Sequence, residues 1–245
     1  MENTGIYSYL VQPYQVDFQQ KINFTTLGNY LIQSAGIHAE ERGFGLQQLL
    51  ENKKAWFLTR LAIDIEQYPL QFEKIWIETW VSEVGDRFTT RNFNILNRNK
   101  EVIGGASSSW AMIDLTTRRP ASLSNLIGND YVDGNLACRV MQPEKVPSVS
   151  KDLAPTEQLT VKYSDLDTNS HVNSMRYMQW MLDLFPLELY QERHIGRFEI
   201  NYAAETHYSD NVALYKEEVQ PSEEFIIELK KEPAKTVCRG KVTFR

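Results

Sequence analysis

Four segments in the first half of the chain alternate polar and apolar side chains and are rich in aromatic and β-branched residues. They cover residues 54–65, 75–84, 89–98 and 104–114. Such alternation is typical of half-buried strands. Turn residues separate the segments at Gly85-Asp86 and between Arg98 and Lys100. The pattern predicts an antiparallel meander.

Helical spacing comes before this meander. Apolar and small side chains recur there at intervals of three and four residues, namely Leu27, Tyr30, Leu31, Ser34 and Ala35. A second, short helix is predicted through Leu46, Leu49 and Leu50. The first half therefore has the order helix, then long strands.

Residues 142–155 contain three prolines and little periodicity, which is typical of a linker. We therefore predict an N-terminal domain at 1–141, a linker at 142–155 and a C-terminal domain at 156–245. The second half repeats the order of the first. It has a strand at 158–164, a helix at 172–185 and further strands at 198–208, 211–219, 224–232 and 236–244.

The helix predicted in the second half carries one apolar stripe, and Pro186 limits its end. The stripe consists of Val172, Met175, Met178, Met181, Leu182 and Phe185. A sheet can wrap such a stripe, because a long helix against one curved antiparallel sheet buries both apolar faces. The predicted fold class is therefore α+β, with this arrangement present twice.

Composition and charge exclude several classes of protein. The chain is 42% hydrophobic and 24% charged, as ordinary globular proteins are. It has no run of eighteen apolar residues and no signal-peptide pattern, so we expect a cytoplasmic protein that does not bind membranes. The net charge of −6 disfavours nucleic acid as a partner. Cys138 and Cys238 have no metal-site spacing and are expected to be buried, so no metal is predicted.

Polar residues crowd the start of the second helix, at Asp165, Asp167, Asn169, His171 and Asn173. Capping of the helix explains some of them. It does not explain the histidine or the alternating acids and amide, which we expect to face one way in an extended segment. His171 is suited to handle or orient protons. The N–H groups at a helix start can stabilise an oxyanion when a thioester carbonyl is attacked.

Almost the whole chain resembles the fatty acyl-ACP thioesterases of plants and bacteria, which are built of two hotdog domains. The resemblance rests on the segments SAGIHAEERGFG (34–45), IWIETWVSEVGDRFTTRNF (75–93), SSSWAMIDLTTRRPASL (107–123), YSDLDTNSHVNSMRYMQW (163–180) and INYAAETHYSDNV (200–212). The expected fold is therefore a pair of tandem hotdog domains, of which the second is catalytic.

The resemblance implies a role for four residues. In the family, a DxNxH pattern falls on Asp167, Asn169 and His171, and an acid on the following strand falls on Glu205. Glu205 would activate a water, with His171 and Asp167 supporting it, and Asn169 would orient the substrate carbonyl or the water. The family often has a cysteine directly after the acid, where this chain has Thr206. This departure favours direct attack by water over a covalent route.

The first half lacks this chemistry, because its helix lead-in, taken as residues 23–31, has no acid pair and no histidine. We expect it to form the acyl pocket and set chain length, with Trp56, Trp76, Trp80 and Trp110 as candidate wall residues or core residues. The other histidines, His38, His194 and His207, are interpreted as surface or packing residues, and His207 is also a candidate for a supporting position.

The implied partner is acyl carrier protein, and the substrate itself carries phosphopantetheine, so no cofactor is expected. Three basic pairs are candidates to receive the carrier or its phosphate, although each also fits a solvated charged face. They are Arg87 with Arg91, Arg118 with Arg119, and Arg193 with Arg197. A homodimer is possible through exposed sheet edges.

Three other functions are compatible with the sequence. An acyl-CoA thioesterase would act on the same thioester and pantetheine arm. A dehydratase on a 3-hydroxyacyl carrier would move a proton α to the carbonyl and leave the thioester intact. A non-catalytic acyl-binding protein would keep only the pocket.

Overall fold

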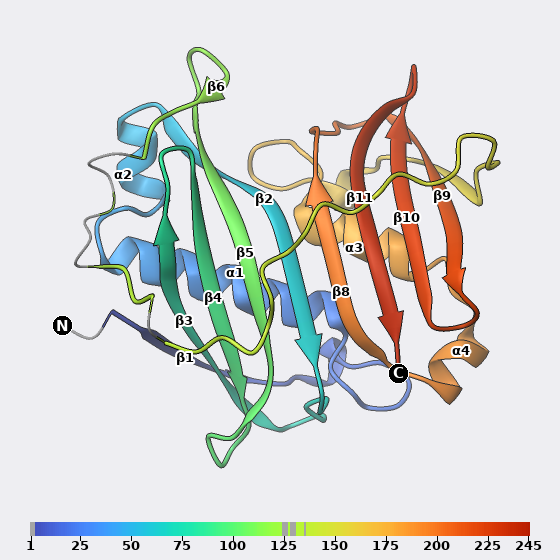
Figure 1. The fold of residues 1–245 in the computed structure, drawn as a ribbon, viewed down its shortest axis with the longest axis horizontal. Coiled ribbons are helices and arrows are strands. Elements are labelled where there is room, and N and C mark those ends of the chain that lie inside the picture. Colours follow the sequence, from blue (N-terminus) through green and yellow to red (C-terminus); the bar gives the residue numbers. More distant parts are fainter. Residues whose placement is uncertain (1–2, 124–126, 128–130, 135) are drawn as a thin grey trace. The chain divides into compact units, whose positions relative to one another are not determined.

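The computed structural model describes residues 3–123, 127, 131–134 and 136–245. The chain divides into two compact units, Met1–Pro143 and Glu144–Arg245. Each unit pairs an antiparallel sheet with a helix on one of its faces (Figure 1).

The first unit begins with strand β1 and the helices, followed by the long strands. Its elements are β1 (Gly5–Leu10), a 3-10 turn (Pro13–Gln15), α1 (Phe24–Glu41), α2 (Leu46–Glu51), β2 (Lys54–Ile65), β3 (Lys74–Val84), β4 (Phe88–Leu96), β5 (Val102–Asp114) and β6 (Arg119–Pro120). The main sheet has the order β1-β3-β4-β5-β2, all antiparallel, and β6 pairs with β5. The meander predicted from the sequence is confirmed, whereas β1 and β6 were not predicted.

The second unit repeats this order with shorter elements. They are β7 (Glu157–Thr160), a 3-10 turn (Tyr163–Asp165), α3 (Ser174–Leu182), α4 (Leu187–Glu192), β8 (Ile195–Tyr202), β9 (Asn211–Gln220), β10 (Glu224–Lys231) and β11 (Lys235–Phe244). The sheet order is β8-β11-β10-β9-β7, again all antiparallel. The α+β fold class is therefore confirmed in both units.

The helix of the second unit is shorter than its apolar stripe. All six stripe residues are buried, yet α3 ends at Leu182, because Pro186 cannot continue a helix and instead caps α4. Gly240 of β11 lies directly against Met181, and a side chain at position 240 would occupy the place of the Met181 sulfur. A glycine in the strand thus allows the helix to approach the sheet closely.

Most of the predicted linker at 142–155, from residue 144 onwards, belongs to the second unit and is bonded to it. The Val146 amide donates to the Asn201 side chain at 2.7 Å, and Ser150 bonds to Glu217 through both its amide and its hydroxyl. Val146 and Val149 are buried. This segment therefore packs along the second unit and is held there by hydrogen bonds.

A buried polar pair lies between α1 and the sheet of the first unit. The Arg91 guanidinium donates to His38 Nδ1 at 2.9 Å and to Thr79 Oγ1 at 3.2 Å, and all three residues are buried. Burial and the nearby Arg91 charge lower the pKa of His38 to about 3, so this imidazole is neutral. The prediction that Arg91 could join Arg87 in receiving the carrier is therefore wrong, because Arg91 is buried.

Neither cysteine forms a disulfide, and only Cys238 is fully buried, since Cys138 is half-buried. Within the described part of the chain, no helix is both long and apolar enough to cross a membrane.

Candidate active site

The loop before the main helix has the same structure in both units. Residues 11–30 and 161–180 have identical secondary structure, position by position, at an offset of 150 residues. Each copy contains a 3-10 turn, a tight turn and then the helix. Gln20 and Ser170 occupy equivalent positions and both have a left-handed backbone, with φ of 63° and 62°. The two units are therefore duplicates at the point where the candidate residues lie.

Asp167 organises this loop in the second unit. Its Oδ1 accepts hydrogen bonds from the backbone N–H groups of Asn169 at 2.8 Å and His171 at 3.2 Å, while its own N–H donates to the His171 carbonyl at 2.8 Å. A carboxylate that accepts backbone N–H groups in this way fixes a turn. Within the described part of the chain, these bonds join Asp167 to its own loop, and none of them reaches the side chain of His171.

Asp17 makes the same bonds in the first unit. Its Oδ1 accepts from the amides of Gln19 and Lys21 at 2.8 and 3.0 Å, and its N–H donates to the Lys21 carbonyl at 2.8 Å. The counterpart of the candidate segment is thus residues 17–23 and not 23–31, where the sequence analysis looked. An acid is present there after all, but the histidine position holds Lys21.

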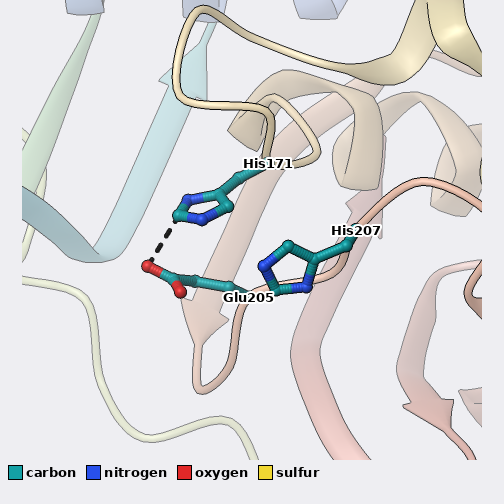
Figure 2. Close-up of side chains that lie close together, drawn as sticks. All are labelled: His171, Glu205 and His207. Carbon is teal, nitrogen blue, oxygen red and sulfur yellow. Dashed lines mark ion pairs between the residues drawn. The ribbon is translucent and has the colours of Figure 1, made fainter.

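The side chains of His171, in this loop, and Glu205 lie close together. His171 Nδ1 lies 3.5 Å from Glu205 Oε1, and the two side chains are 26% and 35% exposed. His171 comes from the loop before α3, and Glu205 comes from the segment after β8, as Figure 2 shows. Glu205 had been predicted within a strand, but β8 ends three residues earlier at Tyr202. The two groups lie slightly beyond hydrogen-bond distance of each other, and both are partly exposed to solvent.

Backbone pairing fixes the distance between these two segments. The Val172 amide donates to the Thr206 carbonyl at 2.9 Å, and residues 171 and 207 form an antiparallel bridge. In the first unit, Ile22 donates to the Pro69 carbonyl and Lys21 bridges to Leu70. Tyr68 is therefore the counterpart of Glu205. The scaffold is shared by both units, but only the second one carries the acid and the histidine.

A third side chain, His207, joins the pair. Its ring packs edge-on against His171 with the centroids 4.9 Å apart. Its amide donates to Asp210 Oδ2 at 3.0 Å, and its Nδ1 lies 4.0 Å from the same oxygen. The sequence analysis named His207 only as a supporting candidate, because no sequence motif connects positions 171 and 207.

Lys231 is a contributor that the sequence analysis missed. Its ammonium group donates to the backbone carbonyl of Glu205 at 2.8 Å and to Asp210 Oδ2 at 2.9 Å. It ties the segment carrying Glu205 to the end of β10. No sequence signal marks this residue, because a lysine in a strand is ordinarily a solvent-facing residue.

The alternating polar residues do not all face one way, as had been expected. Asp165 is buried, accepts from the Lys162 amide at 2.7 Å and lies 3.7 Å from Arg176. The segment is a 3-10 turn followed by a tight turn, so the alternation of an extended strand does not apply. Asn169 is exposed, and no contact of its side chain with Asp167, His171 or Glu205 is recorded among the described residues.

The start of α3 offers fewer free N–H groups than the sequence suggested. Four of the five backbone N–H groups from 172 to 176 already donate to protein acceptors. The acceptors are the carbonyls of Thr206, Asp165 and Asn173 and the Asn173 side chain. Most of this helix end therefore serves to hold the loop and is not available for an oxyanion.

Thr206 is fully buried, so its side chain cannot reach a substrate in the space beside Glu205. Its hydroxyl oxygen makes no well-formed hydrogen bond within the described part of the chain, although it lies near the Tyr177 hydroxyl. The position where the family often has a cysteine is thus directed into the protein interior in this chain.

Two models of known protein families match this chain. The model of the acyl-ACP thioesterase N-terminal domain matches residues 4–131, and that of the acyl-ACP thioesterase C-terminal domain matches residues 149–245. Together they cover most of the chain. The chain belongs to the acyl-ACP thioesterase family.

Solved structures of the family share the fold. The chain is 41% identical to an acyl-ACP thioesterase from Bacteroides thetaiotaomicron, with a TM-score of 0.93 over 99% of this chain and 98% of that one. It is 19% identical to a 12:0-ACP thioesterase from Umbellularia californica, with a TM-score of 0.80 over 100% and 98% of the two chains, which shows the fold alone. The prediction of two tandem hotdog domains is confirmed.

The curated plant relatives are longer than this chain. It is 29% identical to the chloroplastic oleoyl-acyl carrier protein thioesterase of Coriandrum sativum, over 83% of this chain and 60% of the relative. It is 26% identical to the chloroplastic palmitoyl-acyl carrier protein thioesterase of Gossypium hirsutum, over 81% of this chain and 51% of the relative. The chain thus spans between half and two thirds of the length of these thioesterases.

Proposed function

We propose that this protein hydrolyses the thioester between a fatty acyl chain and acyl carrier protein, releasing the free fatty acid and the carrier thiol. The observation that carries the proposal is the placement of Glu205 beside His171 in the second unit, on a scaffold that the first unit duplicates without either residue. The duplicated loop accounts for the presence of Asp167. Glu205 and His171 have no counterpart in the first unit, so we attribute their presence to catalysis.

Glu205 acts as the general base in this proposal. Its carboxylate takes a proton from a water as the water oxygen attacks the thioester carbonyl carbon. The carbon–sulfur bond then breaks, and the proton leaves with the carrier thiol. A positioned base of this kind contributes roughly 10²–10⁴-fold to the rate. His171 Nδ1, 3.5 Å from Glu205 Oε1, orients the carboxylate and stabilises its charge.

Asp167 and Asn169 have different tasks. Asp167 shapes the loop through two backbone N–H groups and so places His171. The exposed amide of Asn169 is available to bind the substrate carbonyl or the attacking water. No covalent acyl-enzyme is needed, since the neighbouring Thr206 is buried and a hydroxyl without a base is a weak nucleophile.

The first unit supplies the acyl pocket in this proposal, as the sequence analysis predicted. Of its tryptophans, Trp80 is fully buried. Trp76 is half-buried under the Lys100 ammonium, which lies 3.6 Å from the ring centroid. Trp80 therefore packs in the core of the first unit, and the residues of the pocket wall stay a prediction. The division at 1–141, 142–155 and 156–245, the cytoplasmic location and the homodimer stay predictions.

The test is a substrate panel with the full chain. Acyl-ACP and acyl-CoA substrates of several chain lengths are incubated with the protein, and both free thiol and free fatty acid are measured. The account predicts equal release of both products, with higher kcat/KM for ACP substrates. Preference for CoA would make it an acyl-CoA thioesterase.

The same panel separates the other reactions. Dehydration of a 3-hydroxyacyl-ACP without thiol release would contradict hydrolysis and identify a dehydratase. Saturable binding of acyl-ACP with no product would identify an acyl-binding protein. Either result would overturn the proposed function.

A further inference from the structure

Three potential metal ligands converge in the second unit. One ligand atom from each of His171, Glu205 and His207 lies within 4.8 Å of the other two. Figure 2 shows the side chains reaching one space from two segments, and a ring nitrogen of His207 faces the other two residues. Hydrolysis as proposed above uses only two of the three, so His207 is unexplained by it.

The spacing fits a small cation after a modest side-chain movement. Zinc binds nitrogen and carboxylate oxygen at about 2.0–2.2 Å in a tetrahedral arrangement, which places its ligands roughly 3.4 Å apart. The His171–Glu205 pair is already separated by 3.5 Å. His207 is the ligand that must close in, and its side chain is 52% exposed.

The surroundings of His207 favour one coordinating nitrogen. Its Nδ1 is the atom beside Asp210 Oδ2, at 4.0 Å. This distance is longer than a hydrogen bond, so Asp210 would orient the ring only after Nδ1 moves closer, and the other nitrogen, Nε2, would then bind the ion. The structure therefore offers His207 Nε2, His171 Nδ1 and a Glu205 oxygen as the ligand set.

Nearby charges do not oppose a cation strongly. The Lys231 ammonium is a positive group near the three ligands, and it donates to the backbone carbonyl of Glu205. Asp210 pairs with that ammonium at 2.9 Å. The lysine charge next to this segment is therefore shared with Asp210.

We propose that His171, Glu205 and His207 form a binding site for zinc or a similar divalent transition-metal ion, and that occupancy blocks hydrolysis. Two imidazoles and one carboxylate suit zinc, copper or nickel better than magnesium or calcium, which prefer all-oxygen sites. The bound ion is an inhibitor and not a cofactor, because it removes the carboxylate that activates water. This consequence rests on the proposed function, whereas the binding itself does not.

The first unit provides an internal control. Lys21, Tyr68 and Leu70 occupy the positions equivalent to His171, Glu205 and His207 on the duplicated scaffold. None of these three side chains is an ordinary zinc ligand. The proposed site is therefore expected once in the chain.

The binding test uses the full chain, treated with EDTA and then freed of it. Zinc binding is measured by calorimetry, and cobalt is added separately to report tetrahedral coordination by its visible absorption. We expect His207→Ala to weaken zinc binding by about tenfold or more. His194→Ala, outside the cluster, is the matched control and should bind as the wild type does. Thermal melting without metal checks that each variant is folded.

The activity test follows fatty acid release from acyl-ACP, because zinc also binds the thiol product. Zinc should inhibit the wild type, and EDTA should restore its activity. The ratio of activity with zinc to activity without zinc is compared for each protein, and this ratio should fall less for His207→Ala than for the wild type. Zinc binding that is absent, or that His207→Ala leaves unchanged in a folded protein, overturns the proposal. Zinc binding without hydrolysis would support the site and contradict only the proposed function.

Discussion

Asp17 and Asp167 occupy the same position in two copies of one loop and make the same three backbone hydrogen bonds. The first copy leads into a unit with Lys21 where the second has His171. Because the aspartate is present in both loops but the histidine in only one, the aspartate is explained by the shape of the loop. Asp167 therefore builds the site, whereas His171 and Glu205 act in it.

Substitution of the two aspartates tests this separation. Asp167→Asn keeps an oxygen acceptor for both N–H groups, so kcat should stay within about tenfold of the wild type, a change of about 1.4 kcal/mol in barrier. Asp167→Ala and Asp17→Ala should each lower the free energy of unfolding by about 1.5–3 kcal/mol, because each leaves backbone donors of the loop without their charged acceptor. Denaturant unfolding and steady-state kinetics provide the two measurements.

The two alanine variants should then differ in activity. Asp17→Ala should retain kcat per folded molecule, whereas Asp167→Ala should lose it, since only the second loop places His171 next to Glu205. Loss of hydrolysis in a well-folded Asp167→Asn variant would contradict this account and assign the Asp167 charge a direct part in the chemistry.

Thr206 is expected to be dispensable for catalysis. Thr206→Val preserves the shape of the buried side chain and removes a hydroxyl that lacks a well-formed hydrogen bond in the described residues. The variant should keep its hydrolysis rate and change stability by less than about 1 kcal/mol, since removing an unsatisfied polar group costs little. A folded Thr206→Val protein without activity would show that the hydroxyl takes part.

Lys231 should support catalysis through the position of Glu205. Lys231→Met removes the bonds to the Glu205 carbonyl and to Asp210. We expect kcat to fall by about tenfold, which corresponds to the loss of about one charge-assisted hydrogen bond. Lys230→Met is the matched control, because Lys230 lies over Tyr215 and beside Glu228 instead. Equal rates for both variants would dismiss this role of Lys231.

The buried His38 makes stability depend on pH. Burial and Arg91 lower its pKa to about 3 in the folded protein, while an unfolded histidine has a pKa of about 6.5. The unfolded chain therefore binds the proton first, and stability is lost as the pH falls from about 6.5 towards 3.

Unfolding by urea at pH 7 and pH 5 measures this effect. His38 should contribute a loss of about 2 kcal/mol between the two values, and His38→Gln should remove that part of the loss. A His38→Gln protein with the same pH dependence as the wild type would refute the role of His38.

The sequence predicted those parts of the fold that repeat a simple pattern. The bounds of β2 match the alternating segment 54–65, and those of β3 to β5 lie within two residues of the prediction. It missed β1, and it placed the end of β8 too late because the chain beyond Tyr202 stays extended without pairing as a strand.

The candidate site was predicted in its members but not in its geometry. The resemblance gave His171 and Glu205, which the structure brings to 3.5 Å. It could not give His207, Lys231 or the match between Asp17 and Asp167, because these depend on backbone pairing across segments that are far apart in sequence. Arg91 was misjudged for the same reason, since a charge in a strand gives no sign of the buried His38 opposite it.

The most direct test of the central claim is the turnover of acyl-ACP by Glu205→Gln, measured beside the wild type at saturating substrate. The substitution keeps the size of the side chain but removes the base, and thermal melting establishes that the variant is folded. The account predicts a fall in kcat of about 10²–10⁴-fold with little change in KM. A folded Glu205→Gln protein that retains kcat within about tenfold of the wild type would contradict it.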